Sequence, residues 1–206
     1  MATMSPESEA RFFAGVEAAG KFFMGESPVQ LAMRKISRLL DEMNIPYAVI
    51  GAMALNEAGY RRVTEDVDLL MTREDLDRFK QEWLGRGYVE KFAGSRALRD
   101  TENNVPIDVV IAGDYPGDGK PKPVRFPDPA TAESGARVRV LPLERLLELK
   151  LASGISAPHR LRDLADVLEV IRIRGLARDF AERLDESVRA KYDELWVAAQ
   201  GAAGDE

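Results

Sequence analysis

The sequence predicts an α+β protein in which a mixed sheet is flanked by helices and followed by a helical C-terminal part. Up to residue 141, segments with helical spacing of apolar residues alternate with short apolar runs typical of buried strands. Beyond Pro142 every apolar pattern has helical spacing. This order favours an α+β core with appended helices. We therefore divide the chain into an N-terminal helical extension (1–26), a core (27–141) and a C-terminal helical region (142–206).

Two helices are expected before the first strand. Residues 5–24 form the first, with Ser5 as its N-cap and Pro6 in its first turn. The second begins at Ser27, and the Asn-Ile-Pro segment at 44–46 ends it. The apolar positions of the first helix are Phe12, Phe13, Val16, Phe22 and Phe23.

Short apolar runs predict the strands of the sheet. Residues 47–50 form the first strand, which leads through Gly51 into a helix at 52–59. Residues 66–71 form the second, and Thr72 caps a helix that ends near Leu84. Further strands are predicted at 87–92, 95–99, 106–111 and 137–141, with a proline-rich loop at 113–130 and C-terminal helices at 143–151, 161–173 and 185–199.

The composition excludes several classes of function. The 206 residues contain no cysteine, so disulfide frameworks, thiolate-bound zinc and cysteine nucleophiles are absent. His159 is the only histidine, which excludes histidine-rich metal sites and gives no support to a Ser-His-Asp triad. No apolar run is long enough for a membrane span, and the first residues do not resemble a secretory signal, so we expect a cytoplasmic protein. The net charge of −6 argues against a large nucleic-acid surface.

The motif Glu65-Asp-Val-Asp68 has the strongest chemical signal in the chain. Side chains alternate along a strand, so Asp66 and Asp68 project together while Val67 points into the core. Asp108 is a third acid on an apolar strand, and the three carboxylates converge if the two strands are neighbours. Carboxylate oxygens of this kind suit Mg²⁺.

A DxD pair on its own more often marks a solvated strand end than a catalytic site. The segment before it favours the catalytic interpretation, because a strand, Gly51 and a helix start at Ala52 precede Asp66. The free N–H groups of a helix start suit a phosphate. A phosphate site beside a metal site is what phosphoryl or nucleotidyl transfer requires.

These residues resemble the signature of the nucleotidyltransferase superfamily, the polymerase-beta-like enzymes. The resemblance rests on Ile50-Gly-Ala-Met-Ala-Leu55 and on Gly59-Tyr-Arg-Arg-Val-Thr-Glu-Asp-Val-Asp-Leu-Leu70, and it covers about residues 30–112. It implies the superfamily fold and two Mg²⁺ ions held by Asp66, Asp68 and Asp108. It also implies a nucleoside triphosphate substrate, with Asp108 assisting the acceptor hydroxyl. Gly51, Ala52, Arg62 and Thr64 are the matching nucleotide-binding positions.

The C-terminal region resembles the abortive-infection type IV toxin branch and related small bacterial nucleotidyltransferase-like proteins. The matching residues lie in Leu147-Glu-Leu-Lys150 and in His159-Arg-Leu-Arg-Asp163-Leu-Ala-Asp166. The resemblance implies that Lys150 contacts the triphosphate and that Arg162 and Asp163 orient it. The alternatives are a solvated lysine on an amphipathic helix for Lys150, and a helix-to-core ion-pair network for Arg162, Asp163 and Asp166.

Ala52 departs from the superfamily pattern, because many active members have serine there. This departure leaves two hypotheses open: an active nucleotidyltransferase, and a degenerate module that binds nucleotide or a partner. For the enzyme, the acceptor is a tRNA, a protein or a small molecule, and the first two would make the chain a toxin with an antitoxin partner. A third interpretation is a homodimer joined through residues 5–24 and 185–200, with a vestigial site.

Overall fold

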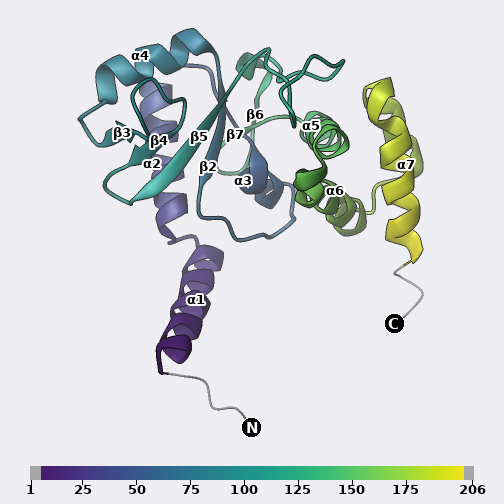
Figure 1. Cartoon of the computed structure of the whole chain (residues 1–206), viewed down its shortest axis with the longest axis horizontal. Coiled ribbons are helices and arrows are strands. Elements are labelled where there is room, and N and C mark those ends of the chain that lie inside the picture. The colour runs from purple at the N-terminus through teal and green to yellow at the C-terminus, as the bar shows by residue number, and fades with distance from the viewer. Residues whose placement is uncertain (1–5, 202–206) are drawn as a thin grey trace.

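The structure, a computed structural model, describes residues 6–201 and confirms the α+β class (Figure 1). Ser5, the predicted N-cap, lies outside the described residues, as do the side chains of Phe12 and Phe13. The helices are α1 (Pro6–Met24), α2 (Pro28–Glu42), α3 (Gly51–Glu57), α4 (Arg73–Trp83), α5 (Leu143–Ser156), α6 (Leu161–Arg174) and α7 (Glu186–Gly201). Short 3-10 helices span Pro129–Thr131, Pro158–Arg160 and Arg178–Arg183.

Seven strands form one mixed sheet in the order β3-β4-β5-β2-β1-β7-β6. Strand β2 runs parallel to β5, and β1 runs parallel to β7, while the other neighbours are antiparallel. The strands are β1 (Ala48–Val49), β2 (Val67–Met71), β3 (Tyr88–Glu90), β4 (Leu98–Asp100), β5 (Val105–Ile111), β6 (Glu133–Ser134) and β7 (Arg139–Val140). The central β2–β5 pair places the two predicted aspartate strands side by side.

The predicted element boundaries differ from the observed ones at several strands. Asp66 immediately precedes β2, because the ladder with β5 begins at Val67. The predicted strand at 95–99 lies instead at Leu98–Asp100, since Ser95 belongs to the turn that follows β3. Strand β6 was not predicted, because its Glu133-Ser134 sequence is polar and exposed.

Local sequence explains the start and the end of α2. The Ser27 hydroxyl accepts a hydrogen bond from the Gln30 N–H, and the Gln30 side chain returns to the Ser27 N–H, which forms a capping box. Asn44 has a φ of 51° and ends the helix, as the Asn-Ile-Pro segment predicted. The buried side of α2 then packs against the sheet.

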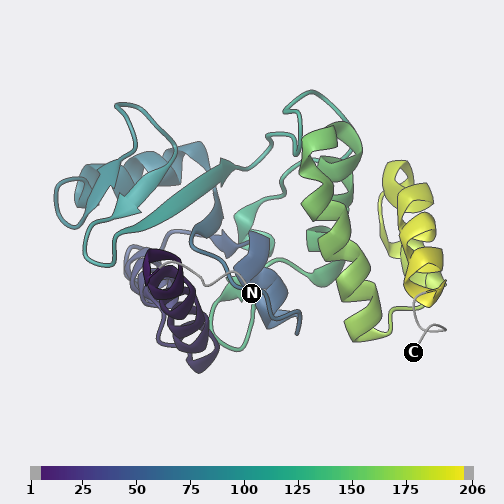
Figure 2. The same cartoon turned by 60° about the horizontal axis from the view of Figure 1, so that its bottom comes forward.

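Two apolar cores lie on opposite faces of the sheet. Helices α2 and α4 cover one face, where alternate residues of β2 and β5, including Val67, are buried. Helices α3, α5, α6 and α7 build the second core against β1 and the Leu70 side of β2. Figure 2 shows α5, α6 and α7 together beyond one edge of the strands, with β3, β4 and β5 on the other side. The C-terminal region is helical, as predicted.

Helix α1 contributes little to either core. Phe22 is buried, but Val16 and Phe23 are exposed, and Figure 1 shows the helix projecting away from the sheet. Among the described side chains of the predicted apolar stripe, Phe22 alone is buried. Within the described residues, no helix combines the length and the apolar character that a membrane crossing would need.

Candidate active site

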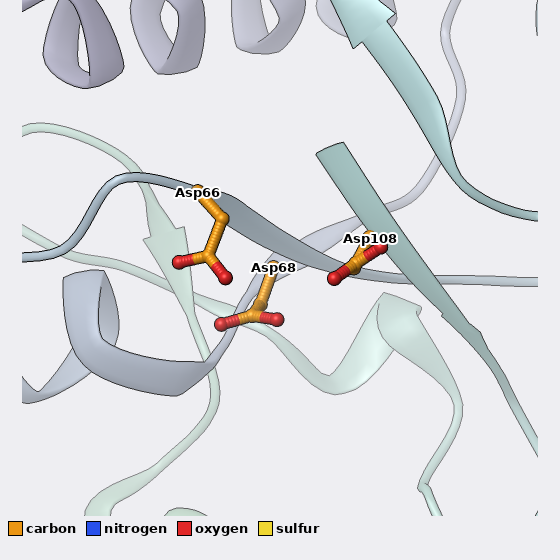
Figure 3. A group of neighbouring side chains, drawn as sticks. All are labelled: Asp66, Asp68 and Asp108. Carbon is orange, nitrogen blue, oxygen red and sulfur yellow. The ribbon is translucent and has the colours of Figure 1, made fainter. Parts of the chain in front are cut away.

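Three aspartates converge at one end of the β2–β5 pair (Figure 3). Asp68 and Asp108 are paired positions in the parallel ladder, and Asp66 lies on the same face, two residues before Asp68. One carboxylate oxygen from each residue lies within 4.8 Å of the other two. Asp66 and Asp68 therefore share one face, as strand alternation predicted. Asp108 joins them because β2 and β5 are neighbouring strands.

Burial and charge repulsion destabilise the ionised form of Asp68. Its pKa is raised to about 7, first by burial and then by the charges of Asp66 and Asp108, while Lys150 and Arg62 act in the opposite direction. The Thr64 hydroxyl donates a hydrogen bond to Asp66, which fixes the orientation of that carboxylate. Three hard oxygen donors that repel one another are a donor set that fits a divalent cation such as Mg²⁺.

Gly51 brings the backbone at the start of α3 directly against Asp68. Its φ is +64°, and a Cβ at this position would lie 1.9 Å from Asp68 Oδ2. Only glycine fits such a close approach in this conformation. The close contact with the Asp68 carboxylate therefore explains why position 51 requires a glycine.

A cavity of about 480 Å³ opens beside the aspartates, between the sheet and helices α5 and α6. All the predicted site residues except Asp108 line it, namely Gly51, Ala52, Arg62, Thr64, Asp66, Asp68, Lys150, Arg162 and Asp163. Asp108 is exposed on the outer side of the cluster. The site residues predicted from the sequence therefore lie together in the structure, although their individual roles stay predictions.

A buried ion-pair network forms the wall of the cavity between the core and the C-terminal helices. Asp166 is only 1% exposed and accepts hydrogen bonds from Arg62 Nη1 at 2.7 and 3.0 Å and from Lys150 Nζ at 2.7 Å. Lys150 also donates to Asp163 at 2.9 Å, and Ser153 donates to Asp163 at 2.7 Å. The predicted ion-pair network is therefore present at Asp163 and Asp166, but its cations are Arg62 and Lys150 and not the predicted Arg162.

The network keeps Asp163 ionised. Burial alone would raise its pKa, but the charge of Lys150 and the hydrogen bonds from Ser153 and Lys150 outweigh burial and lower the pKa below its usual range. Arg162 lies outside the network: it is exposed and forms no ion pair with any described residue. Arg62 and Lys150 thus line the cavity in fixed positions, with their charges balanced by Asp163 and Asp166.

Several lining residues were not predicted as site residues. His159 and Arg160 lie in the 3-10 helix before α6, where Arg160 adds positive charge to the rim, while Phe126 and Leu149 supply apolar surface. The single histidine was interpreted as a helix-start residue, which it also is. Its place at the rim depends on how α6 packs against the core, and no local pattern predicts that packing.

The proline-rich loop is tied to α5. Lys122 donates to the carbonyl of Pro116 at 2.6 Å and to the Ser156 hydroxyl at 3.0 Å, and it also pairs with Asp118. The Lys122 amine thus attaches the loop to α5, and Pro116 of the loop lines the cavity.

The backbone has the fold of known nucleotidyltransferases. It superposes on ANT(2″)-Ia, crystallised in complex with adenylyl-2″-tobramycin, with a TM-score of 0.50 and 15% identity, covering 84% of this chain and 97% of that one. JHP933 from Helicobacter pylori aligns with a TM-score of 0.47 and 18% identity, over 84% of this chain and 89% of that one. No family model and no curated protein sequence matches the chain. The first superposition confirms the predicted nucleotidyltransferase fold.

We expect Gly51→Ala to lower stability and to displace Asp68. A side chain at a φ of +64° costs about 1–2 kcal/mol, and the methyl group would also collide with Asp68 Oδ2. Thermal unfolding measures the first effect. Gly59→Ala is the matched control, because Gly59 also has a positive φ (+94°) but has nothing within 4 Å of the added methyl. Equal losses in the two variants would show that the contact with Asp68 is unimportant.

The raised pKa of Asp68 predicts that Asp68→Asn stabilises the metal-free protein at high pH. Because the folded pKa of about 7 exceeds the ordinary value of 3.8, the wild type loses stability as pH rises from about 4 to 7, and the full cost remains above 7. We expect the variant to gain about 2–4 kcal/mol at pH 8 and almost nothing below pH 4. Chemical denaturation in a metal chelator at several pH values measures this. A gain independent of pH would contradict it.

Proposed function

We propose that the chain is a Mg²⁺-dependent nucleotidyltransferase that moves a nucleoside monophosphate from a nucleoside triphosphate to an acceptor hydroxyl. The proposal rests on the observation that two features lie side by side. A cluster of three carboxylates stands at the mouth of a cavity whose opposite wall carries fixed positive charge. A nucleotidyltransferase needs both features in contact, one for metal and one for the triphosphate.

The cations of the cavity would bind and orient the triphosphate. Lys150 and Arg62 are held by Asp166, so binding a phosphate would require little loss of side-chain entropy. Arg160 and Arg162 also line the cavity and would neutralise the remaining charge. Gly51 and Ala52 line the same cavity directly beside Asp68.

In the proposed reaction the acceptor oxygen attacks the α-phosphorus, the bond to the bridging oxygen breaks, and pyrophosphate leaves. Asp108 is the carboxylate placed to take the hydroxyl proton, because it is exposed on the side of the cluster away from the cavity. Asp66 and Asp68, with Asp108, would hold Mg²⁺. When bound, the ion would neutralise the triphosphate and lower the pKa of the acceptor hydroxyl.

A second candidate function is a module that binds nucleotide without turnover. Ala52 favours it, because the hydroxyl that many active superfamily members place after the glycine is missing. Calorimetry with a nucleoside triphosphate and Mg²⁺, together with transfer of label from an α-³²P-labelled triphosphate, separates the two. Binding with transfer supports the enzyme, binding without transfer supports the module, and absence of binding contradicts both.

The biological role depends on the acceptor. Transfer to a tRNA or a protein would support the toxin half of a toxin–antitoxin pair, with an antitoxin as partner. Transfer to a small molecule would instead parallel the complex of ANT(2″)-Ia with adenylyl-2″-tobramycin. Incubation with labelled triphosphate and separated RNA, protein and small-molecule fractions of a cell extract distinguishes these acceptors.

A further inference from the structure

We propose that the open face of strands β3, β4 and β5 binds the acceptor, and that this acceptor is a small molecule carrying a phosphate group. The inference rests on the proposed function. It concerns the side of the aspartate cluster that lies away from the nucleotide cavity. Helices α2 and α4 cover only one face of these three strands, the face that buries Tyr88, Leu98 and Ile107.

The strand register shows which residues lie on the other face. Arg99 pairs with Pro106 on β5 and with Val89 on β3, so these three side chains share one side of the sheet. Pro106 and Asp108 are two residues apart on β5 and also share that side. Arg99, Asp108 and Val89 are all exposed, Val89 to 43%. The uncovered face is therefore continuous with the catalytic cluster.

Small side chains form the floor next to Asp108, and cations lie beyond it. The Lys91 N–H donates to the Ala97 carbonyl at 3.0 Å, which extends the β3–β4 ladder by one pair. Ala97 consequently stands opposite Asp108, and Lys91 stands one strand further, about 10 Å from Asp108 at the usual strand spacing. Arg99 and Lys91 are diagonal neighbours, about 7–8 Å apart, so their long side chains can reach one anion together.

Both cations are available to a ligand. Within the described part of the chain neither forms an ion pair, and Arg99 is oriented by hydrogen bonds from Nη1 to the Asn104 carbonyl at 2.9 Å and Oδ1 at 3.0 Å. Apart from Asp108 of the aspartate cluster, the nearby carboxylates are engaged by other cations. Glu90 pairs with Lys80, Asp100 and Glu102 pair with Lys35, and Asp114 pairs with Arg96.

This arrangement selects the charge and the size of the acceptor. A polycationic acceptor would meet two unneutralised cations, whereas a phosphate would be bound by both. A long nucleic acid would need several more phosphate contacts, and the chain as a whole has a net charge of −6. A phosphorylated molecule with its hydroxyl at Asp108 and its phosphate at Arg99 and Lys91 fits both the floor and the charges.

The test labels the small-molecule fraction of a cell extract with the wild-type protein, Mg²⁺ and α-³²P-labelled triphosphates. One half of the fraction is treated beforehand with a phosphatase, which is then removed. We expect a labelled product from the untreated half and none from the phosphatase-treated half. The rate of labelling should be at least tenfold lower in Lys91→Glu. Arg73→Glu is the matched charge reversal, because Arg73 is exposed at the start of α4 on the covered face, and it should retain the wild-type rate.

The outcomes separate the acceptor inference from the proposed function. Label in the RNA or protein fraction, a product that resists the phosphatase, or an unchanged rate in Lys91→Glu would overturn the acceptor inference and leave the enzyme intact. Absence of label in every fraction would overturn both. A direct readout is the amide NMR spectrum of the Mg²⁺-loaded protein, in which ribose 5-phosphate should shift residues 89–91 and 97–99. Equal shifts with ribose, or none, would contradict the inference.

Discussion

Replacing Asp68 with asparagine should reduce nucleotidyl transfer by about 10³-fold or more. Asp68 is the central member of the aspartate cluster, and its carboxylate lies between Asp108 in the strand register and the backbone of Gly51. Asparagine keeps the size but removes the negative charge that a divalent cation requires. A 10³-fold loss corresponds to about 4 kcal/mol of transition-state stabilisation, which is in the range expected for loss of metal assistance. Initial rates of label transfer measure the effect.

Asp77→Asn is the matched control for this variant. Asp77 is exposed on α4, away from the cluster, so the same chemical change should leave the rate within about twofold of wild type. Because Asp68→Asn should also be more stable than the wild type at pH 8, its low rate would not result from unfolding. A variant that retains most of its activity would contradict the assigned metal site.

Replacing Asp166 with alanine should lower the free energy of unfolding by about 3–5 kcal/mol. Its carboxylate is almost completely buried and binds both Arg62 and Lys150, so its removal would leave Arg62 without its ion-pair partner and Lys150 paired only with Asp163. The partly buried charge of Arg62, left without a partner, contributes most of this large cost. For a chain of this size the change corresponds to a fall in Tm of about 6–20 °C.

Two further variants show whether burial causes the effect. Asp193→Ala removes an exposed carboxylate that pairs with Arg178 at 3.2 Å, and it should cost less than about 0.5 kcal/mol. Asp166→Asn keeps an oxygen acceptor, so its loss in the free energy of unfolding should lie between the losses of the two alanine variants. If Asp166→Ala were as stable as Asp193→Ala, the network would not join the C-terminal helices to the core.

The aspartate cluster was predictable because the sequence information that defines it is local. Alternation within Asp66-Val-Asp68 fixed the shared side of two carboxylates, and the apolar run around Asp108 placed the third on a strand. Only the pairing of β2 with β5 was missing, and the superfamily resemblance supplied the expected order. The long helices were predicted for the same reason, since their apolar spacing is local.

Features that depend on distant contacts were not predictable in the same way. The bonds from Arg62 to Asp166 join residues 104 positions apart, and no local pattern encodes them. The hydrogen bond from Lys122 to the Ser156 hydroxyl on α5 likewise joins residues 34 positions apart. Strand β6 forms by pairing with β7, although its own residues are polar. The division of the chain at residues 26 and 141 stays a prediction.

The most direct test of the central claim compares the fate of the α- and γ-phosphates of one triphosphate. Wild-type protein is incubated with Mg²⁺, a cell extract and ATP, CTP, GTP or UTP labelled at either position. Nucleotidyl transfer predicts that the α-label enters the acceptor while the γ-label is released as pyrophosphate, and that neither occurs in Asp68→Asn. Entry of the γ-label into the acceptor, or transfer of neither label despite Mg²⁺-dependent binding of the triphosphate, would contradict the claim.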